Sequence, residues 1–337
     1  MRFDLSDEQR GIRDAVRALA RERYDAQTVR RQMDGGDDGE RLWRELVRAG
    51  WPRLAVSSEH DGQGLGMVEV ALVCEELGGV LAPATFLGNA AAACAVEYAG
   101  GAEHHSRWLP GFVSGESRGA IGMRDGVGGA LAIDADGAAA LIVAGDDSVT
   151  LAPATAYTLE PLDGVDVTRR LARVSAITYE ERLDGNLGGV LDRIEVMLAA
   201  ELVGVAQRAL DLALTHAKTR EQFGRLIGAY QAVSHRCADM LVAVESARSA
   251  VLSAAWIADH DGGQLPFAAS VAKVSAANAA WQCAAGALQI HGGIGFTWEH
   301  DCHLLLRRAA ASSRLLRSVD WHLDRVASLR GLERTVP

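Results

Sequence analysis

The chain has 337 residues, of which 49% are hydrophobic, and its mean hydropathy is close to zero. This length and composition suit a protein with two or three packed units and give no sign of disorder. The formal net charge of −10, with Lys and Arg interleaved among acidic residues, excludes nucleic acid as an expected partner, because nucleic-acid surfaces need clustered positive charge.

The sequence also predicts where the protein works. Met1–Asp7 has no signal-peptide pattern. Charged residues break the apolar runs before they reach membrane-spanning length, so we expect a cytoplasmic protein with no membrane partner. The five cysteines are scattered without a C-x-x-C pair, and we expect them to be reduced core residues. They are Cys74, Cys94, Cys237, Cys283 and Cys302.

Residues 1–117 are predicted to form an N-terminal helical domain. Ser6 followed by Gln9 has the pattern of a capping box, and apolar residues then repeat at helical spacing. The apolar stripes predict a packed helical core. Further helices are expected over residues 40–49, 66–77 and 87–98.

The pattern changes over residues 118–183, which predict a small middle β domain. Short apolar runs at 139–144, 149–151 and 174–179 are bounded by Gly and Asp clusters. Residues 184–332 then return to apolar residues at three- and four-residue steps, which predicts a C-terminal four-helix bundle. Its alanine-rich helices allow close contact with further helices, so we expect an oligomer.

The first motif with chemical content lies where a long apolar helix is predicted to end. Arg220 is followed by Gln222, Phe223 and Gly224, and Gln231 stands at the start of the next helix. Arg offers a fixed fork of donors that suits a diphosphate, Gln adds a neutral donor and acceptor, and glycine lets a ligand approach the backbone. The turn therefore predicts a site for a phosphate-bearing cofactor.

A second motif places an amide side chain just before a cluster of glycines. Gln289 precedes Gly292 and Gly293, and Gly295 and Phe296 follow. A capped turn would explain either motif alone, but it does not explain both, so we interpret the pair as cofactor-binding segments.

Together the two motifs resemble the acyl-CoA dehydrogenase family of flavoproteins. Its R-x-x-F-G and Q-x-x-G-G-x-G-F/Y turns are both present in order, and segments 50–56 and 74–78 extend the resemblance. The resemblance implies a mostly α fold with an N-terminal helical bundle, a reduced central β domain and a C-terminal four-helix bundle. It also implies FAD as the cofactor and α,β-desaturation of an acyl-CoA thioester, in fatty acid or steroid side-chain β-oxidation.

The resemblance further implies how the motifs contact FAD. Arg220 and Gln222 would contact the diphosphate, and Phe223 would pack against the nucleotide half. In this family such contacts reach a flavin held by the neighbouring subunit, so an assembly is implied as well. The predicted cofactor-binding residues are Arg220, Gln222, Phe223, Gln231, Gln289, Gly292 and Gly293.

The catalytic carboxylate of the family has no counterpart at its usual position. The Glu of the family's Y-E-G turn falls on Leu316 here. Relatives with the Glu on the earlier long helix align it with Ile194, one residue before Glu195. One residue turns a helical side chain by about 100 degrees, so Glu195 is either a displaced base or a solvated or salt-bridged carboxylate. Glu201 is a second alternative.

The family's flavin-ring loop is not legible either, because Arg124 leads into a glycine-rich stretch without a G-S-D turn. A chain with these features resembles the shorter, non-catalytic subunit of heteromeric actinobacterial acyl-CoA dehydrogenases of the steroid side-chain type. A homologous full-length chain would then supply the base in an α2β2 heterotetramer. Two alternatives stay open: a self-sufficient homotetramer with a displaced Glu base, and an assembly scaffold without flavin.

Residue types that can bind a metal also occur together where Cys302 and His303 follow His300 and Asp301. Adjacent residues on a helix point in different directions and cannot all bind one ion. We therefore expect an ordinary helix start and no metal at this position.

Overall fold

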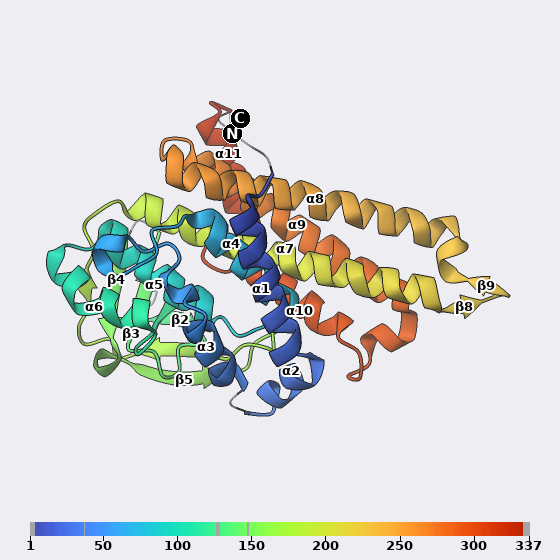
Figure 1. Cartoon of the computed structure of the whole chain (residues 1–337), viewed down its shortest axis with the longest axis horizontal. Helices are drawn as coiled ribbons and strands as arrows, with labels where there is room; N and C mark the ends of the chain where they lie inside the picture. Colours follow the sequence, from blue (N-terminus) through green and yellow to red (C-terminus); the bar gives the residue numbers. More distant parts are fainter. Residues whose placement is uncertain (1–3, 37, 126–128, 147, 333–337) are drawn as a thin grey trace, which may run out of the picture.

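The computed structural model describes residues 4–36, 38–125, 129–146 and 148–332. Helices make up both ends of the described chain, and a sheet lies between them in sequence (Figure 1). The predicted fold class, mostly α with a central β region, is confirmed. The domain boundaries at 117/118 and 183/184 stay a prediction.

In the described residues, the N-terminal region contains six α-helices. The predicted capping box starts the first one: the Gln9 amide donates to Ser6 Oγ at 3.1 Å, and the Ser6 amide donates to Gln9 Oε1 at 3.0 Å. The predicted helices are present, while the second and sixth were not predicted; the sixth contains Pro110. The six are α1 (Asp7–Arg23), α2 (Ala26–Met33), α3 (Asp38–Arg48), α4 (Met67–Gly79), α5 (Thr85–Ala99) and α6 (Ala102–Ser114).

As far as the structure describes it, the middle region forms a seven-stranded sheet with the order β5-β6-β2-β1-β3-β4-β7. Only β1 and β3 run parallel among these neighbouring described strands; the other pairs are antiparallel. Helix α5 packs against β1, which joins the sheet to the N-terminal helices. The strands are β1 (Gly119–Arg124), β2 (Ala130–Ile133), β3 (Ala140–Ala144), β4 (Val149–Pro153), β5 (Thr158–Leu162), β6 (Leu171–Ser175) and β7 (Glu181–Arg182).

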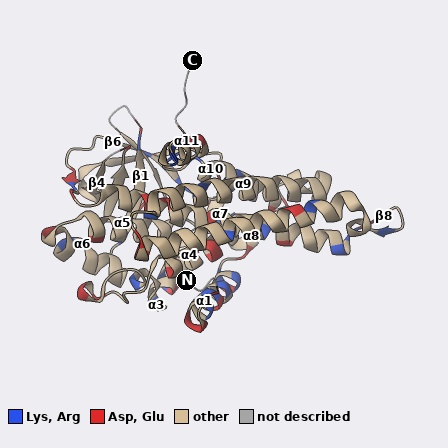
Figure 2. Cartoon of the chain, turned by 90° about the horizontal axis from the view of Figure 1, so that it is seen from above, with Lys and Arg blue, Asp and Glu red and all other residues tan. Residues whose placement is uncertain are grey.

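The C-terminal region is a helical bundle. Helices α7, α8 and α9 pack on one another and extend together as a long arm, and α10 packs against α7 and α9 (Figure 1). Charged residues of both signs are interspersed along the chain (Figure 2). The helices are α7 (Leu187–Thr219), α8 (Gln231–His260), α9 (Leu265–His291), α10 (Cys302–Ser312) and α11 (Val319–Leu329).

Two glycines allow the N-terminal and C-terminal helices to share one core. Helix α4 crosses α7 so closely that a Cβ on Gly204 would lie 1.8 Å from the Glu75 carbonyl oxygen. A Cβ on Gly78 would lie 2.3 Å from the carbonyl oxygen of Glu201. Side chains at these two positions would therefore force the helices apart.

One long helix bears on the expectation about apolar runs. By length and composition, α8 could cross a membrane, but Glu245 and Arg248 interrupt its apolar run. In this fold α8 packs against α7 and α9, which accounts for part of its apolar surface. All five cysteines are buried and free, as predicted.

Candidate functional site

The first predicted motif lies at the tip of the arm, where α7 ends and a small hairpin projects (Figure 1). The hairpin pairs β8 (Glu221–Gln222) with β9 (Arg225–Leu226). Phe223 and Gly224 form its two-residue loop with φ of 53° and 76°, as a mirror-image hairpin turn requires. The Phe223 side chain is 94% exposed.

The tip is held by its own contacts, and Gln222 Nε2 donates to the Glu221 carbonyl at 2.8 Å. Tyr230 donates its hydroxyl hydrogen to the Gln222 carbonyl at 3.1 Å, and the Arg225 guanidinium lies 3.9 Å from the centre of the Tyr230 ring. The Arg220 side chain is exposed and makes no hydrogen bond or ion pair within the described residues. Gln231 begins α8 as predicted and is also exposed.

The second predicted motif lies at the end of α9. Gly292 has a φ of 66° and begins the 3-10 helix η5 (Gly292–Phe296). A Cβ on Gly292 or Gly293 would meet nothing within 4 Å, so this stretch of backbone is open to a ligand. Gln289, one turn earlier, is exposed.

A stack of imidazoles joins the ends of the two motif-bearing helices. The ring centroid of His291, at the end of α9, lies 4.3 Å from that of His216 in the last turn of α7 and 4.3 Å from that of His300. Burial and the neighbouring His291 lower the pKa of both His216 and His300. The fold thus brings the two motifs to one end of the bundle. Sequence reasoning did not identify this stack, because its members lie far apart in the chain.

The same stack contains a group of metal-binding residue types. The ligating atoms of His291, His300 and Cys302 lie within 4.8 Å of one another. His303, which follows Cys302 in the sequence, packs on Trp298 instead. Each donor is already engaged: His291 Nδ1 lies 2.8 Å from the Ala287 carbonyl oxygen, and His300 Nδ1 accepts the Cys302 amide hydrogen at 3.2 Å. Burial raises the pKa of the Cys302 thiol to about 12. The expectation of no metal stays a prediction.

The two positions considered for a catalytic carboxylate lie next to each other in space. Lys273 of α9 donates to Glu195 Oε2 at 2.6 Å and to the Leu315 carbonyl at 3.0 Å, immediately before Leu316. Glu195 is fully buried, and its other oxygen lies 3.2 Å from His322 Nε2. Sequence reasoning missed Lys273 and His322; the signal available was a lysine within an alanine-rich helix.

These contacts decide the state of Glu195. Burial alone would raise its pKa, but Lys273 and His322 outweigh burial and hold the pKa of Glu195 below its usual value. The side chain is thus the salt-bridged alternative and not the solvated one. A general base must reach the proton that it removes, and this carboxylate faces Lys273 and His322 in the core.

Glu201 belongs to a second buried ionic network. Its carboxylate contacts Arg169, lies 3.2 Å from Arg308 Nη1 and accepts a hydrogen bond from Ser312 Oγ at 3.0 Å. Arg308 is fully buried and also binds Asp166 at 2.5 Å. The network joins α7, α10 and the segment before β6, so it fixes the sheet against the bundle.

The family follows from comparison with known proteins. The N-terminal and C-terminal domain models of acyl-CoA dehydrogenases match residues 6–116 and 189–315. The acyl-CoA dehydrogenase IpdE2 of Mycobacterium tuberculosis is 35% identical over 329 residues, which cover 96% of this chain and 97% of that protein. This chain belongs to the acyl-CoA dehydrogenase family. The predicted family and enzyme class are confirmed, and with them FAD as the family's cofactor.

Other relatives agree with this assignment. A variant of the Tcur3481-Tcur3483 steroid ACAD superimposes with a TM-score of 0.86 and 27% identity, covering 96% of this chain and 98% of that one. The ChsE4-ChsE5 complex of Mycobacterium tuberculosis has the same fold, with a TM-score of 0.85 at 22% identity over 99% of this chain and 100% of that one. FadE34 of the same organism is 34% identical, and the match covers 96% of this chain but 48% of that protein.

Residues 126–128 of the glycine-rich stretch without a G-S-D turn lie outside the described residues. The described residue before it, Arg124, donates to both oxygens of Glu180 at 2.8 and 2.9 Å. Arg124 is thus engaged within the sheet region.

Proposed function

We propose that this chain is a subunit of an FAD-dependent acyl-CoA dehydrogenase and that its arm completes the FAD site of a homologous partner chain. FAD, when bound, accepts the hydride that leaves the β-carbon of the thioester. The partner supplies the base that removes the α-proton. One observation carries the division of labour: Lys273 holds Glu195 in an internal ion pair and bonds the Leu315 carbonyl, and the neighbouring position considered for a base is a leucine, Leu316.

The chemistry of the arm tip fits the diphosphate of FAD. The Arg220 guanidinium offers paired donors and has no partner within the described chain. The exposed amides of Gln222, Gln231 and Gln289 add neutral donors, and the backbone at Gly292 is open. The chain's part in the site is therefore to bind and orient the cofactor through phosphate contacts.

The surface of the arm supports an assembly. Phe223, Leu226, Leu241 and Val242 are exposed by 94%, 41%, 49% and 66% along the tip and α8. Exposed apolar residues on one long element are typical of a protein interface. Two relatives are named as pairs of chains, Tcur3481-Tcur3483 and ChsE4-ChsE5, which supports a heteromeric assembly. We propose that this assembly is an α2β2 heterotetramer that acts in the cytoplasm on an acyl-CoA thioester.

Co-expression with a homologous full-length acyl-CoA dehydrogenase tests the proposal. The two chains should purify together with bound FAD and reduce a dye when an acyl-CoA is added. The lone chain should bind little FAD and reduce no dye. Robust dye reduction by the lone chain would contradict the proposal.

The self-sufficient homotetramer is tested by Glu195→Gln. If Glu195 were the base, an active lone chain would lose several orders of magnitude in kcat on this change. We expect instead that the heteromer keeps its rate, because Glu195 is paired in the core. An absorbance spectrum of the purified complex tests the flavin-free scaffold, since a scaffold would show no flavin bands.

A further inference from the structure

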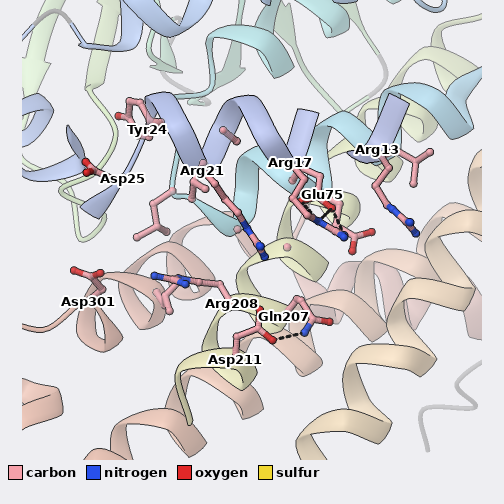
Figure 3. A pocket seen from close by; sticks show the side chains of 18 of the residues that line it. Arg13, Arg17, Arg21, Tyr24, Asp25, Glu75, Gln207, Arg208, Asp211 and Asp301 are labelled. Atoms are coloured by element: carbon pink, nitrogen blue, oxygen red, sulfur yellow. Dashed lines mark hydrogen bonds and ion pairs between the residues drawn. The ribbon is translucent and has the colours of Figure 1, made fainter. Parts of the chain in front are cut away.

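A cavity of about 910 Å³ lies between α1, α4, α7, α8 and α10 (Figure 3). This volume is within the range of about 300–1,000 Å³ that is usual for small-molecule sites. None of the residues predicted to bind FAD lines it, and neither Glu195 nor Leu316 does. The cavity is therefore separate from the site proposed above and needs its own explanation.

The carboxylates around the cavity are all engaged. Arg17 of α1 pairs with Glu76 at 2.7 Å, and Arg248 of α8 pairs with Glu75 at 2.9 Å. These ion pairs join α1 and α8 to α4, so they hold the walls of the cavity together. The other four carboxylates also have partners. Asp25 accepts the Thr28 amide hydrogen at the start of α2, and Asp211 accepts a hydrogen bond from Gln207. Glu245 pairs with Arg248, and Asp301 pairs with Arg30.

Two guanidinium groups in the lining have no such partner in the described residues. Arg21 comes from α1 and Arg208 from α7, and neither makes a hydrogen bond or an ion pair in the described part of the chain. Figure 3 shows both side chains in the space between the two helices. Both guanidinium groups are thus free to bind an anion, and an arginine fork matches the geometry of a carboxylate.

The rest of the lining is partly apolar. Leu72 and Val80 come from α4 and its end, Leu304 and Leu305 from α10, and Val29 from α2. An anion without an apolar part would leave this surface in contact with water. We propose that the cavity binds an amphipathic carboxylate, with its head between Arg21 and Arg208 and its hydrocarbon chain against α4 and α10. This site does not depend on the proposed FAD site.

Titration calorimetry of the full chain with decanoate tests the site. Wild-type protein should bind decanoate, and Arg21→Gln and Arg208→Gln should each weaken binding by about tenfold or more, since each removes a charge-assisted hydrogen bond. Arg53→Gln is the matched control, because Arg53 is exposed and outside the cavity. No binding by the wild type, or equal binding by all four proteins, would overturn the proposal.

A second variant tests the cavity without touching its charges. Ala26 lines the cavity but is exposed, so Ala26→Trp should fill the space and leave the melting temperature unchanged. Decanoate binding should then fall by about tenfold or more, as expected when the apolar contact is lost. Undiminished binding would place decanoate elsewhere and overturn the site. Acetate and inorganic phosphate should bind more weakly than decanoate; tighter binding of either would overturn the amphipathic ligand.

Discussion

The charged side chains in the middle of α7 and at its end lie in opposite environments. In the middle, Glu195 and Glu201 are buried, and each is paired with cationic side chains from distant segments. At the end, Arg220 is exposed and has no partner in the described ranges. A buried charge must be paired because its desolvation is costly, whereas an exposed charge is free to bind something outside the chain. Along this helix, the paired charges therefore belong to the packed core, whereas the unpaired Arg220 indicates a recognition surface.

Removal of the buried partner of Glu195 tests this comparison with the largest expected effect. Lys273→Met leaves the Glu195 carboxylate with His322 alone, and we expect a loss of about 3–5 kcal/mol in the free energy of unfolding, measured by urea denaturation. The double variant Lys273→Met/Glu195→Leu should recover much of that loss, because no unpaired charge remains. A loss below about 1 kcal/mol for the single variant would show that Glu195 is solvated after all.

At the exposed end of α7, removal of the charged side chain should weaken cofactor binding without destabilising the fold. Arg220→Ala should alter the free energy of unfolding by no more than about 0.5 kcal/mol, since the exposed side chain makes no hydrogen bond or ion pair within the described residues. In the co-purified complex it should weaken FAD binding by about 1.5–3 kcal/mol, measured by FAD release on dilution. Arg182→Ala, which removes an exposed arginine paired with Asp184, is the control and should leave FAD retention unchanged.

The imidazole stack between the two regions should respond to pH. Burial and neighbouring His291 lower the pKa of His216 and His300 in the folded chain, so the unfolded chain binds more protons at mildly acidic pH. The stabilisation is present above the ordinary histidine pKa and is lost as pH falls below it. The melting temperature should drop as the pH is lowered from about 7. His300→Asn should make the drop smaller, and an unchanged drop would exclude His300 as its source.

The smallest effect is expected in the hairpin itself. Gly224 has a φ of 76° and open space around it, so Gly224→Ala meets no clash and costs only about 1 kcal/mol of backbone strain. Hydrogen exchange should show faster opening of the β8–β9 amides without a change in global stability. Gly224→Asn is the matched control, because Asn tolerates this conformation; equal effects of Ala and Asn would mean that the turn does not need the positive φ.

The local features of this protein were predictable from neighbouring residues. The capping box at Ser6, the apolar periodicity of α7 and the start of α8 at Gln231 depend on contacts within a few positions. The two glycine-bearing turns also follow local rules, and they identified the family. Helix α6 was not predicted; it contains Pro110, a residue that usually disfavours a helix interior, and it packs against α5.

The environment of the candidate residues could not be predicted in the same way. Glu195 meets Lys273 from 78 positions away, and Arg308 meets Asp166 from 142 positions away. The cavity between α1 and α7 likewise exists only because distant helices enclose it. By itself the sequence determined the elements, the motifs and the family, since these depend on local order along the chain. Tertiary structure decided which charges are paired and which are free, because burial and partners are set only when separate elements pack together.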